Sequence, residues 1–594
     1  MSTTTTPTIL TRGGAWLVES AEPASIFTPE KLSEEHRMIG RTTEQFVRNE
    51  VLPNLERLEQ KDWALARQLL RRAAELDLIG VDVPETYGGV QMDKTATVVV
   101  NERMALSASF ATTFGADSNL AVLPLLLFGT EDQKRKYIPR LVSGELVGAY
   151  ALSESGSGSD ALGARTRATR QADGSFVLSG EKMWITNGGF ADLFIVFAKV
   201  DGQHFTAFIV ERGFPGVSNG KEEHKMGLHG SSTTPLLLQD ARVPAENVLG
   251  EIGKGHKVAF NVLNFGRYKL GAMCSGGCKM AVGESAKYAA QRKQFGQPIA
   301  NFGAIKFKLG EMTLRAYAVE SLLYRTAGLI DAMLADHDPN DSEAVLAAVE
   351  EFAIEASIAK VAGSESLSYA VDENVQIHGG NGFVHDYPAE RLYRDARVNR
   401  IFEGTNEINR LLISGMLVRK ALKGVLPLIP AAKKLMDEIM SPSPAAFSDA
   451  TGLLDEERRA VTSFKKVALM ILGTAMQRYG ERLTDEQEVL TFAADIVIDV
   501  FQAESVLLRA IDAKQRGVAN ADLHLETAQA FVNEAGGRIE LNARRGLAAM
   551  AEGDILRTQL AALKRLFKLT PVNTVAIRRR LAEETVFRGS YVFD

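Results

Sequence analysis

The sequence predicts an α+β protein that is mostly helical. Apolar residues at helical spacing cover 29–146 and return after residue 253, whereas 147–252 contain short apolar runs separated by Asp-Gly and Asn-Gly-Gly turns. A chain of 594 residues with 45% apolar content is long enough for three or four domains. We therefore expect an N-terminal helical domain, a middle β-barrel-like domain, a C-terminal four-helix bundle and an additional C-terminal helical domain.

The domain boundaries follow changes in composition. Residues 1–28 are an N-terminal extension, 29–146 the first helical domain and 147–252 the β domain. Val258, Val262 and Phe265 begin a helical pattern, which predicts a catalytic bundle over 253–420. Prolines between 427 and 444 interrupt any helix, so we expect a linker over 421–450. Helical stripes then predict the additional domain over 451–594.

The composition excludes several classes of function. A net charge of −6 gives no basic surface for nucleic acid. Two cysteines are too few for a disulfide framework, and the nine histidines lack metal-ligand spacing, so no metal site is predicted. Neither an export signal nor a membrane span is visible, and we expect a cytoplasmic protein. The apolar stretch 424–440, which has lysines nearby, leaves peripheral contact with a membrane open.

The segment 156–161, GSGSDA, has the letters of a dinucleotide-binding G-x-G-x-x-A motif. That motif opens a helix after a strand, whereas here the chain runs on into an Asp-Gly turn and another strand. We therefore predict a connection between strands and no Rossmann fold.

The segment 400–406, RIFEGTN, places Glu403 between Phe402 and Gly404 at a turn that enters a helix. Apolar neighbours raise the pKa of a carboxylate toward neutrality, which suits a base that removes a proton next to a carbonyl group. Gly404 lets a ligand approach the backbone, and the helix N-terminus offers free N–H groups. Taken alone, the pattern is explained better by an acid that the macrodipole stabilises at the start of a helix.

Four further segments accompany this turn: 150–160 (YALSESGSGSD), 182–188 (KMWITNG), 292–296 (RKQFG) and 376–382 (QIHGGNG). Together with 400–407 they resemble the acyl-CoA dehydrogenase family of flavoenzymes, over about residues 33–420. The segment 264–267 (NFGR) and the additional C-terminal domain resemble its very-long-chain branch. Some members place the catalytic Glu directly before this Arg. Here that position is Gly266, which leaves Glu403 without a visible rival.

The resemblance implies FAD as cofactor and assigns roles to individual residues. Glu403 would be the catalytic base. The flavin of the same chain would be lined by Tyr150, Leu152, Ser153, Gly158, Ser159, Trp184, Ile185, Thr186, Thr405 and Glu407. The FAD of a neighbouring subunit would contact Arg292, Phe295, Gln376, Gly379 and Gly380. The substrate would contact Ser159, Asn264, Arg267, Phe402 and Gly404. An aromatic wall and small hydroxyls also suit a flat flavin ring with polar edges. One position departs from the family, because Phe302-Gly303 stand where many members have a polar pair.

The implied reaction is α,β-dehydrogenation of a medium- or long-chain fatty acyl-CoA to the trans-2-enoyl-CoA in β-oxidation. Electrons would pass to an electron-transfer flavoprotein, and the additional domain would favour a homodimer. Two alternatives stay open: an acyl-CoA oxidase that uses oxygen, and a non-catalytic assembly or scaffold protein derived from the family. The segment 120–124, where very-long-chain members carry glycines, has Ala121 and Pro124 and leaves the chain length open.

Overall fold

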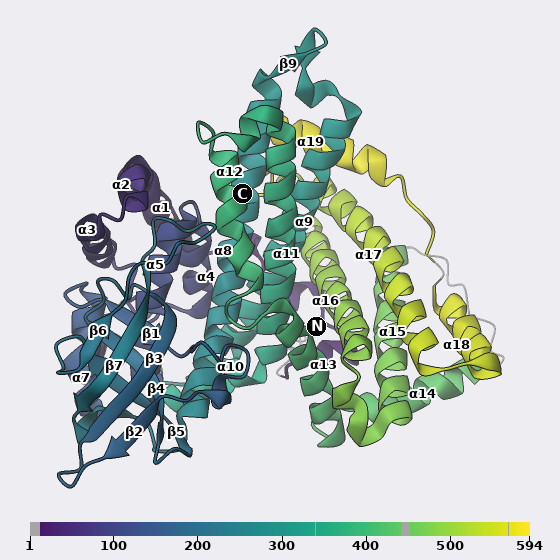
Figure 1. Ribbon diagram of the computed structural model, residues 1–594. Coiled ribbons are helices and arrows are strands. Elements are labelled where there is room, and N and C mark those ends of the chain that lie inside the picture. Colours follow the sequence, from purple (N-terminus) through teal and green to yellow (C-terminus); the bar gives the residue numbers. More distant parts are fainter. Residues whose placement is uncertain (1–11, 339, 441–451, 568) are drawn as a thin grey trace, which may run out of the picture.

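A computed structural model of the protein describes residues 12–338, 340–440, 452–567 and 569–594 (Figure 1). Parts of the predicted extension and linker, 1–11 and 441–450, lie outside the described residues. Along the described chain, helices precede a sheet, and two further groups of helices follow it. The predicted fold class, α+β and mostly helical with an additional C-terminal helical region, is confirmed.

The first helical region packs against the sheet and the start of the bundle. Its helices are α1 (Glu34–Phe46), α2 (Leu55–Glu59), α3 (Trp63–Glu75), α4 (Lys94–Met104), α5 (Ala108–Ser118), α6 (Val122–Phe128) and α7 (Glu131–Val142). Ser33 caps α1 by accepting from the backbone N–H of His36, and Thr130 caps α7 by accepting from that of Gln133.

Helices α5 and α6 are unusually apolar. Within the described part of the chain, Ala108–Phe128 is the one helical stretch whose length and composition would allow it to cross a membrane. In the most apolar 18 residues of this stretch, 83% are buried inside the protein. Phe110 and Phe114 lie in the core between the first helices and the sheet. The apolar residues of this stretch therefore serve packing inside the protein.

The middle region forms one eight-stranded sheet. Its strands are β1 (Gly148–Ala151), β2 (Arg167–Arg170), β3 (Phe176–Thr186), β4 (Leu193–Val200), β5 (His204–Glu211), β6 (Val217–Asn219), β7 (Thr233–Val243) and β8 (Val248–Leu249). The order is β6-β7-β3-β2-β4-β5-β8, with β1 paired to β4 in parallel. The GSGSDA segment joins β1 to β2 through one short turn of 3-10 helix, Ala161–Gly163, so it does not open a dinucleotide-binding helix.

Long helices form the predicted bundle: α8 (Gly255–Gln291), α9 (Gly303–Leu334), α11 (Ala353–His378) and α13 (Asn406–Leu422), with α10 (Ser342–Glu351) and α12 (Pro388–Ala396) between them. Val258, Val262 and Phe265, which predicted α8, are all buried. A small hairpin, β9 (Lys293–Gln294) and β10 (Gln297–Pro298), lies at the far end of α8, away from the sheet (Figure 1).

The additional helices lie beside the bundle on the side away from the sheet (Figure 1). They are α14 (Leu428–Met440), α15 (Asp455–Tyr479), α16 (Gln487–Gln515), α17 (Ala521–Met550), α18 (Gly553–Leu566) and α19 (Thr574–Arg588). Helix α14 shows that the prediction of no helix in 421–450 is wrong for this stretch. Pro427 precedes α14 and Pro430 lies in its first turn, where a backbone N–H has no acceptor within the helix anyway.

The described part of the N-terminal extension binds the additional helices to the bundle. Trp16 is 1% exposed, and its ring packs against Phe501 of α16 with 4.7 Å between ring centroids. Its indole N–H donates to Glu355 of α11 at 2.8 Å. Just after the extension, Glu30 accepts from Arg509 of α16 at 2.6 Å. No sequence pattern predicted these contacts.

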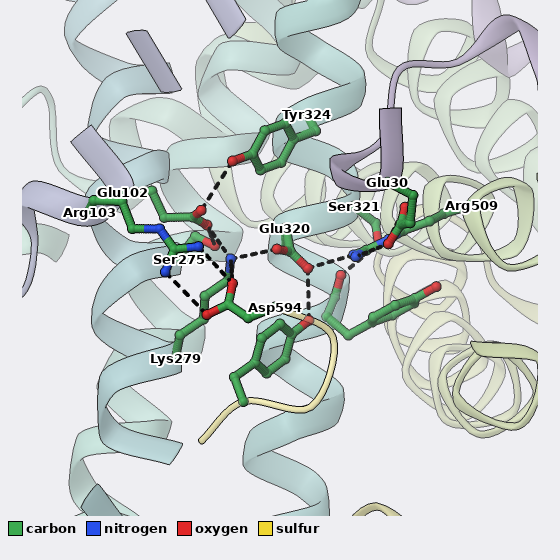
Figure 2. Close-up of polar contacts among 12 residues, drawn as sticks. Glu30, Glu102, Arg103, Ser275, Lys279, Glu320, Ser321, Tyr324, Arg509 and Asp594 are labelled. Atoms are coloured by element: carbon green, nitrogen blue, oxygen red, sulfur yellow. Dashed lines mark hydrogen bonds and ion pairs between the residues drawn. The ribbon is translucent and has the colours of Figure 1, made fainter. Parts of the chain in front are cut away.

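A buried network of charges joins three parts of the molecule (Figure 2). Lys279 of α8 contacts Glu102 of α4 at 3.0 Å, Glu320 of α9 at 2.5 Å and Asp594 at 3.1 Å. Burial alone would lower the pKa of Lys279, but the three carboxylates raise it above its usual range. Arg509 binds the other oxygen of Glu320 at 2.7 Å and extends the network to α16. Such pairs fix the packing of the helices, because removing one partner leaves a buried charge.

Candidate active site

Glu403 occupies a tight turn between a short 3-10 helix, Arg397–Arg400, and α13. Its φ is 57°, in the left-handed region that a side chain disfavours, and Gly404 follows with a φ of 78°. The hydroxyl of Thr405 then caps α13 by accepting from the backbone N–H of Ile408. Strained backbone at a non-glycine residue persists only where the surroundings hold it, which directs attention to the contacts of the turn.

A lysine and an asparagine hold the turn from the bundle side. Lys360 of α11 donates to the backbone oxygen of Gly404 at 2.8 Å and to Oδ1 of Asn406 at 2.6 Å. Burial lowers the pKa of Lys360 to about 8. The sequence reasoning missed Lys360. A lysine inside the apolar run Ile358-Ala359-Lys360-Val361-Ala362 was an available signal, because a buried charge needs a partner.

Two further side chains contact the backbone of the turn. Asn409 donates to the carbonyl oxygens of Gly404 and Thr405 at 2.9 and 3.0 Å. Arg267 of α8 donates from Nε to the carbonyl of Glu403 at 3.3 Å and from Nη1 to Oδ1 of Asn264 at 2.7 Å. Arg267 and Asn264 were predicted as substrate contacts. Arg267 contacts the backbone of the turn directly, whereas Asn264 contacts Arg267.

The surroundings of the Glu403 carboxylate shift its pKa. Burial raises its pKa from 4.5 to about 7, and the charges of Arg267 and Lys360 offset part of this effect. Within the described part of the chain, Oε2 is buried without a hydrogen-bond partner. The carboxylate lies against Gly266 of α8, where an added Cβ would stand 2.5 Å from Oε2. The position that holds an acid in some relatives therefore gives room here to Glu403.

Glu403 faces a cavity between the first helical region, the sheet and the bundle. Phe402, Gly266 and Thr186 also line it, together with Ala111, Thr112, Gly115, Ala116, Asn119, Leu120, Lys269, Leu270 and Met273. Three small residues of the lining, Ala111, Gly115 and Ala116, come from α5. They precede the segment 120–124, which the sequence analysis considered for chain length. Tyr150 is also close enough to interact with Glu403. Burial is the main cause that raises the pKa of its phenol, and the negative charge of Glu403 raises it further.

The β1–β2 connection, residues 152–166, is held by a buried carboxylate. Glu154 accepts from the backbone N–H groups of Arg165 and Thr166 at 2.6 and 3.1 Å. It also pairs with Lys182 of β3 at 2.7 Å, and the Lys182 side chain is fully buried. Lys182 donates to the carbonyl of Leu152 at 3.2 Å as well. Both charged residues lie in the segments that carried the family resemblance, yet their structural role was not foreseen.

Several predicted flavin residues lie at the end of β3 and in the β1–β2 connection. Trp184 has a φ of 59° at an irregularity in the β3–β7 pairing, and its side chain is 58% exposed. The sequence prediction also names Leu152, Ser153, Gly158, Ser159, Ile185 and Thr186 here; Ile185 is buried, Leu152, Ser153 and Thr186 are half-buried, and Gly158 and Ser159 are exposed. On α13, Thr405 is half-buried and Glu407 is exposed.

The predicted neighbour-subunit residues gather elsewhere. Arg292, Gln376, Gly379 and Gly380 are exposed where α8 and α11 end side by side, and the ring of Phe295 is 93% exposed. The rise of a helix places Arg292 roughly 37 Å along α8 from Arg267. The structure therefore does not bring this group to Glu403 of the same chain.

The departure at Phe302-Gly303 has a structural counterpart. The ring of Phe302 packs edge-on against Phe295 with centroids 6.0 Å apart. An apolar contact that supports the exposed ring stands at the position where many relatives have a polar pair.

A β domain between two helical domains, with a half-buried acid of raised pKa at their junction, defines an oxidoreductase of the acyl-CoA dehydrogenase class. Models of the N-terminal, middle and C-terminal domains of acyl-CoA dehydrogenases match residues 33–145, 149–241 and 253–417. A further model, also described as an acyl-CoA dehydrogenase C-terminal domain, matches 463–565. The chain belongs to the acyl-CoA dehydrogenase family.

Full-length relatives support this assignment. A probable acyl-CoA dehydrogenase of Bacillus subtilis (strain 168) is 47% identical over 576 residues, covering 96% of this chain and 97% of that protein. The human mitochondrial very long-chain specific acyl-CoA dehydrogenase is 35% identical, covering 84% of this chain and 76% of that protein. The crystal structure of an acyl-CoA dehydrogenase from Bacillus anthracis complexed with FAD is 48% identical, with a TM-score of 0.96 over 98% of this chain and 100% of that one.

Proposed function

We propose that the protein is an FAD-dependent dehydrogenase that converts fatty acyl-CoA to trans-2-enoyl-CoA in fatty acid β-oxidation, with Glu403 as the base. One observation carries the proposal. Glu403 is a half-buried acid with a pKa raised to about 7, and its Oε2, which is buried and has no hydrogen-bond partner among the described residues, lies at a cavity shared with Thr186 of the sheet. An acid that stands at a helix start only because the macrodipole stabilises it would need neither a buried carboxylate oxygen nor a cavity beside it.

The residues present fit FAD. Trp184 offers an exposed aromatic face two residues from Thr186, which lines the cavity. At Gly156 and Gly158 an added Cβ would meet no described atom within 4 Å, so their backbone is open to a ligand. When bound, FAD supplies the acceptor for the substrate's hydride. Ser153, Trp184 and Thr186 would hold the flavin portion.

A second subunit would complete the cofactor site. At Gly379 and Gly380, too, an added Cβ would meet no described atom within 4 Å, and Arg292 beside them supplies a positive charge. This surface suits the pyrophosphate portion of FAD held mainly by another copy of the chain. The roughly 37 Å between Arg292 and Arg267 along α8 favours a site built by two chains. A homodimer is the assembly that we propose.

The chain's own residues then perform three tasks. Glu403 takes the proton from the α-carbon onto its carboxylate as the α C–H bond breaks, while the β-carbon loses a hydride. Arg267 and Lys360 stabilise the ionised form of Glu403 and hold its turn. Phe402 and the apolar cavity wall exclude water from the reacting atoms. A positioned base contributes ~10²–10⁴-fold to such a rate.

The test is the variant Glu403→Gln. It should retain FAD and bind acyl-CoA, but acyl-CoA should no longer bleach the flavin absorbance. The matched control is Glu488→Gln, since Glu488 is an exposed acid in the first turn of α16 and represents the helix-start alternative. Bleaching at a substantial rate in Glu403→Gln would contradict the base assignment. A colourless wild-type protein that binds no FAD would revive the scaffold reading.

The acyl chain and the electron acceptor are two further parts of the proposal. Ala111, Gly115 and Ala116 leave space along α5 for an apolar chain, which supports a medium- or long-chain acyl group. A chain-length series of acyl-CoA esters, followed by flavin absorbance, tests this. We propose an electron-transfer flavoprotein as acceptor; peroxide release faster than dye-coupled turnover would instead indicate an oxidase.

We propose a cytoplasmic location, with peripheral membrane contact through α14 as a further prediction. Co-sedimentation with vesicles, compared between the whole chain and a deletion of 424–440, decides the second point.

A further inference from the structure

Helix α13 carries the catalytic turn at its start and a contact with the additional helices one turn later. Arg410 donates from Nη1 and Nη2 to the two oxygens of Glu365 of α11, at 2.7 and 2.9 Å. Its Nε donates to Oδ1 of Asp495 of α16 at 2.7 Å. Both carboxylates are needed to pair all three nitrogens of this guanidinium group.

The contact continues without a break to the turn. Glu365 Oε1 also accepts from Nδ2 of Asn406 at 3.1 Å, and Oδ1 of Asn406 accepts from Lys360 at 2.6 Å. Lys360 donates in turn to the backbone of Gly404 at 2.8 Å. The full series is Asp495, Arg410, Glu365, Asn406, Lys360, Gly404.

Asp495 differs from the other groups that hold the turn. Lys360, Asn409 and Arg267 all belong to the bundle, whereas Asp495 lies on α16. The Arg410 side chain is only 14% exposed, so water is a poor substitute for a lost acceptor. Without Asp495, Glu365 would be the one described carboxylate left to accept hydrogen bonds from Arg410. Glu365 also accepts a hydrogen bond from Asn406.

We propose that Asp495 is a positioning residue for catalysis, through which the additional helical region holds the catalytic turn. This rests on the proposed function of Glu403. Removing the Asp495 carboxylate lets Arg410 and Glu365 rearrange, and the rearrangement reaches Gly404 through Asn406 and Lys360. The positioning affects the chemical step more than substrate binding, because the series ends on the backbone beside the base.

Asp499 provides a matched control. It lies one turn further along α16, is 10% exposed, and pairs with Arg538 of α17 at 2.7 Å. Both aspartates line the cavity between the bundle and the additional helices. Asp499 and Arg538 both belong to the additional helices, so Asp499→Ala removes a comparable ion pair that does not involve α13.

The experiment compares FAD-loaded wild type, Asp495→Ala, Asp495→Glu and Asp499→Ala. The readouts are kcat and KM for acyl-CoA, FAD content and thermal midpoint. We expect kcat of Asp495→Ala to fall about tenfold, with KM within about twofold, since small displacements of reacting groups cost 10–100-fold. Asp495→Glu should recover most of the rate. Asp499→Ala should lower the thermal midpoint and keep the wild-type kcat.

A wild-type kcat in Asp495→Ala, or an equal loss in Asp499→Ala, would overturn the proposal. Should Asp495→Ala not fold, Asp495→Asn is measured in the same way, and an unchanged kcat there is equally decisive. Glu403→Gln run alongside separates the two claims. Bleaching retained in Glu403→Gln refutes the base assignment, whereas an inactive Glu403→Gln with a normal Asp495→Ala refutes the positioning role alone.

Discussion

The raised pKa of Glu403 predicts that the protein becomes less stable as this acid ionises. Its pKa is 4.5 in the reference state and about 7 in the folded protein, so the folded state binds the proton more tightly. The stability that the protonated acid contributes is therefore present at low pH and is lost as the pH rises through about 7. Between pH 5 and pH 9 the change in unfolding free energy is about 2–3 kcal/mol.

The comparison is between wild type and Glu403→Gln at both pH values. The variant keeps every other titratable group, so the contributions of groups that do not interact with Glu403 cancel in the difference. If the 594 residues unfold as one unit, the unfolding entropy is about 1.2 kcal/mol/K, and the variant should gain about 2 °C in thermal midpoint over wild type between pH 5 and pH 9. Calorimetry measures this. An identical pH dependence would refute the raised pKa. If the variant instead gained thermal midpoint over wild type at pH 5, the charges of Arg267 and Lys360 would lower the pKa of Glu403 by more than burial raises it.

Two further predictions concern the surroundings of this acid. Gly266→Ala places a methyl group 2.5 Å from the Glu403 carboxylate, and flavin bleaching should slow about 10–100-fold, whereas Gly537→Ala on α17, open within 4 Å among described atoms, should leave the rate unchanged. Equal rates in both variants would show that the carboxylate does not need this space. Lys182→Met leaves Glu154 without its buried cation and should cost about 3–5 kcal/mol and reduce bound FAD, as thermal melts and flavin absorbance would measure. Unchanged FAD content would contradict a role for this pair in shaping the cofactor loop.

Periodicity was enough to predict the order of the domains, because each helix and strand buries one regular face. Val258, Val262 and Phe265 illustrate this, since all three are buried as their spacing predicted. Glu403 could be singled out only together with the four accompanying segments, because taken alone its turn fits a helix-start acid better. Its pKa could be predicted only in direction, since the balance of burial against Arg267 depends on tertiary contacts.

Other features carry no local pattern. Trp16 packs against Phe501, which lies 485 residues later, and no periodicity links two such positions. The helix at 428–440 was not predicted, because proline breaks the interior of a helix. Pro430 lies in the first turn, where proline is tolerated. Lys360 was missed because one charge inside a long apolar helix leaves the helical pattern intact, while its partner, the carbonyl of Gly404, comes from a turn 44 residues later.

The packing of Trp16 has a consequence for the order of events during synthesis. A ribosome adds about 5–20 residues per second, so Trp16 emerges roughly 25–100 s before Phe501 does. Throughout that interval the Trp16 ring lacks the contact that Phe501 later supplies, although its indole N–H can already reach Glu355 of α11 once that helix is made. The first described segment of the chain therefore gains its full set of contacts only after α16 has been synthesised.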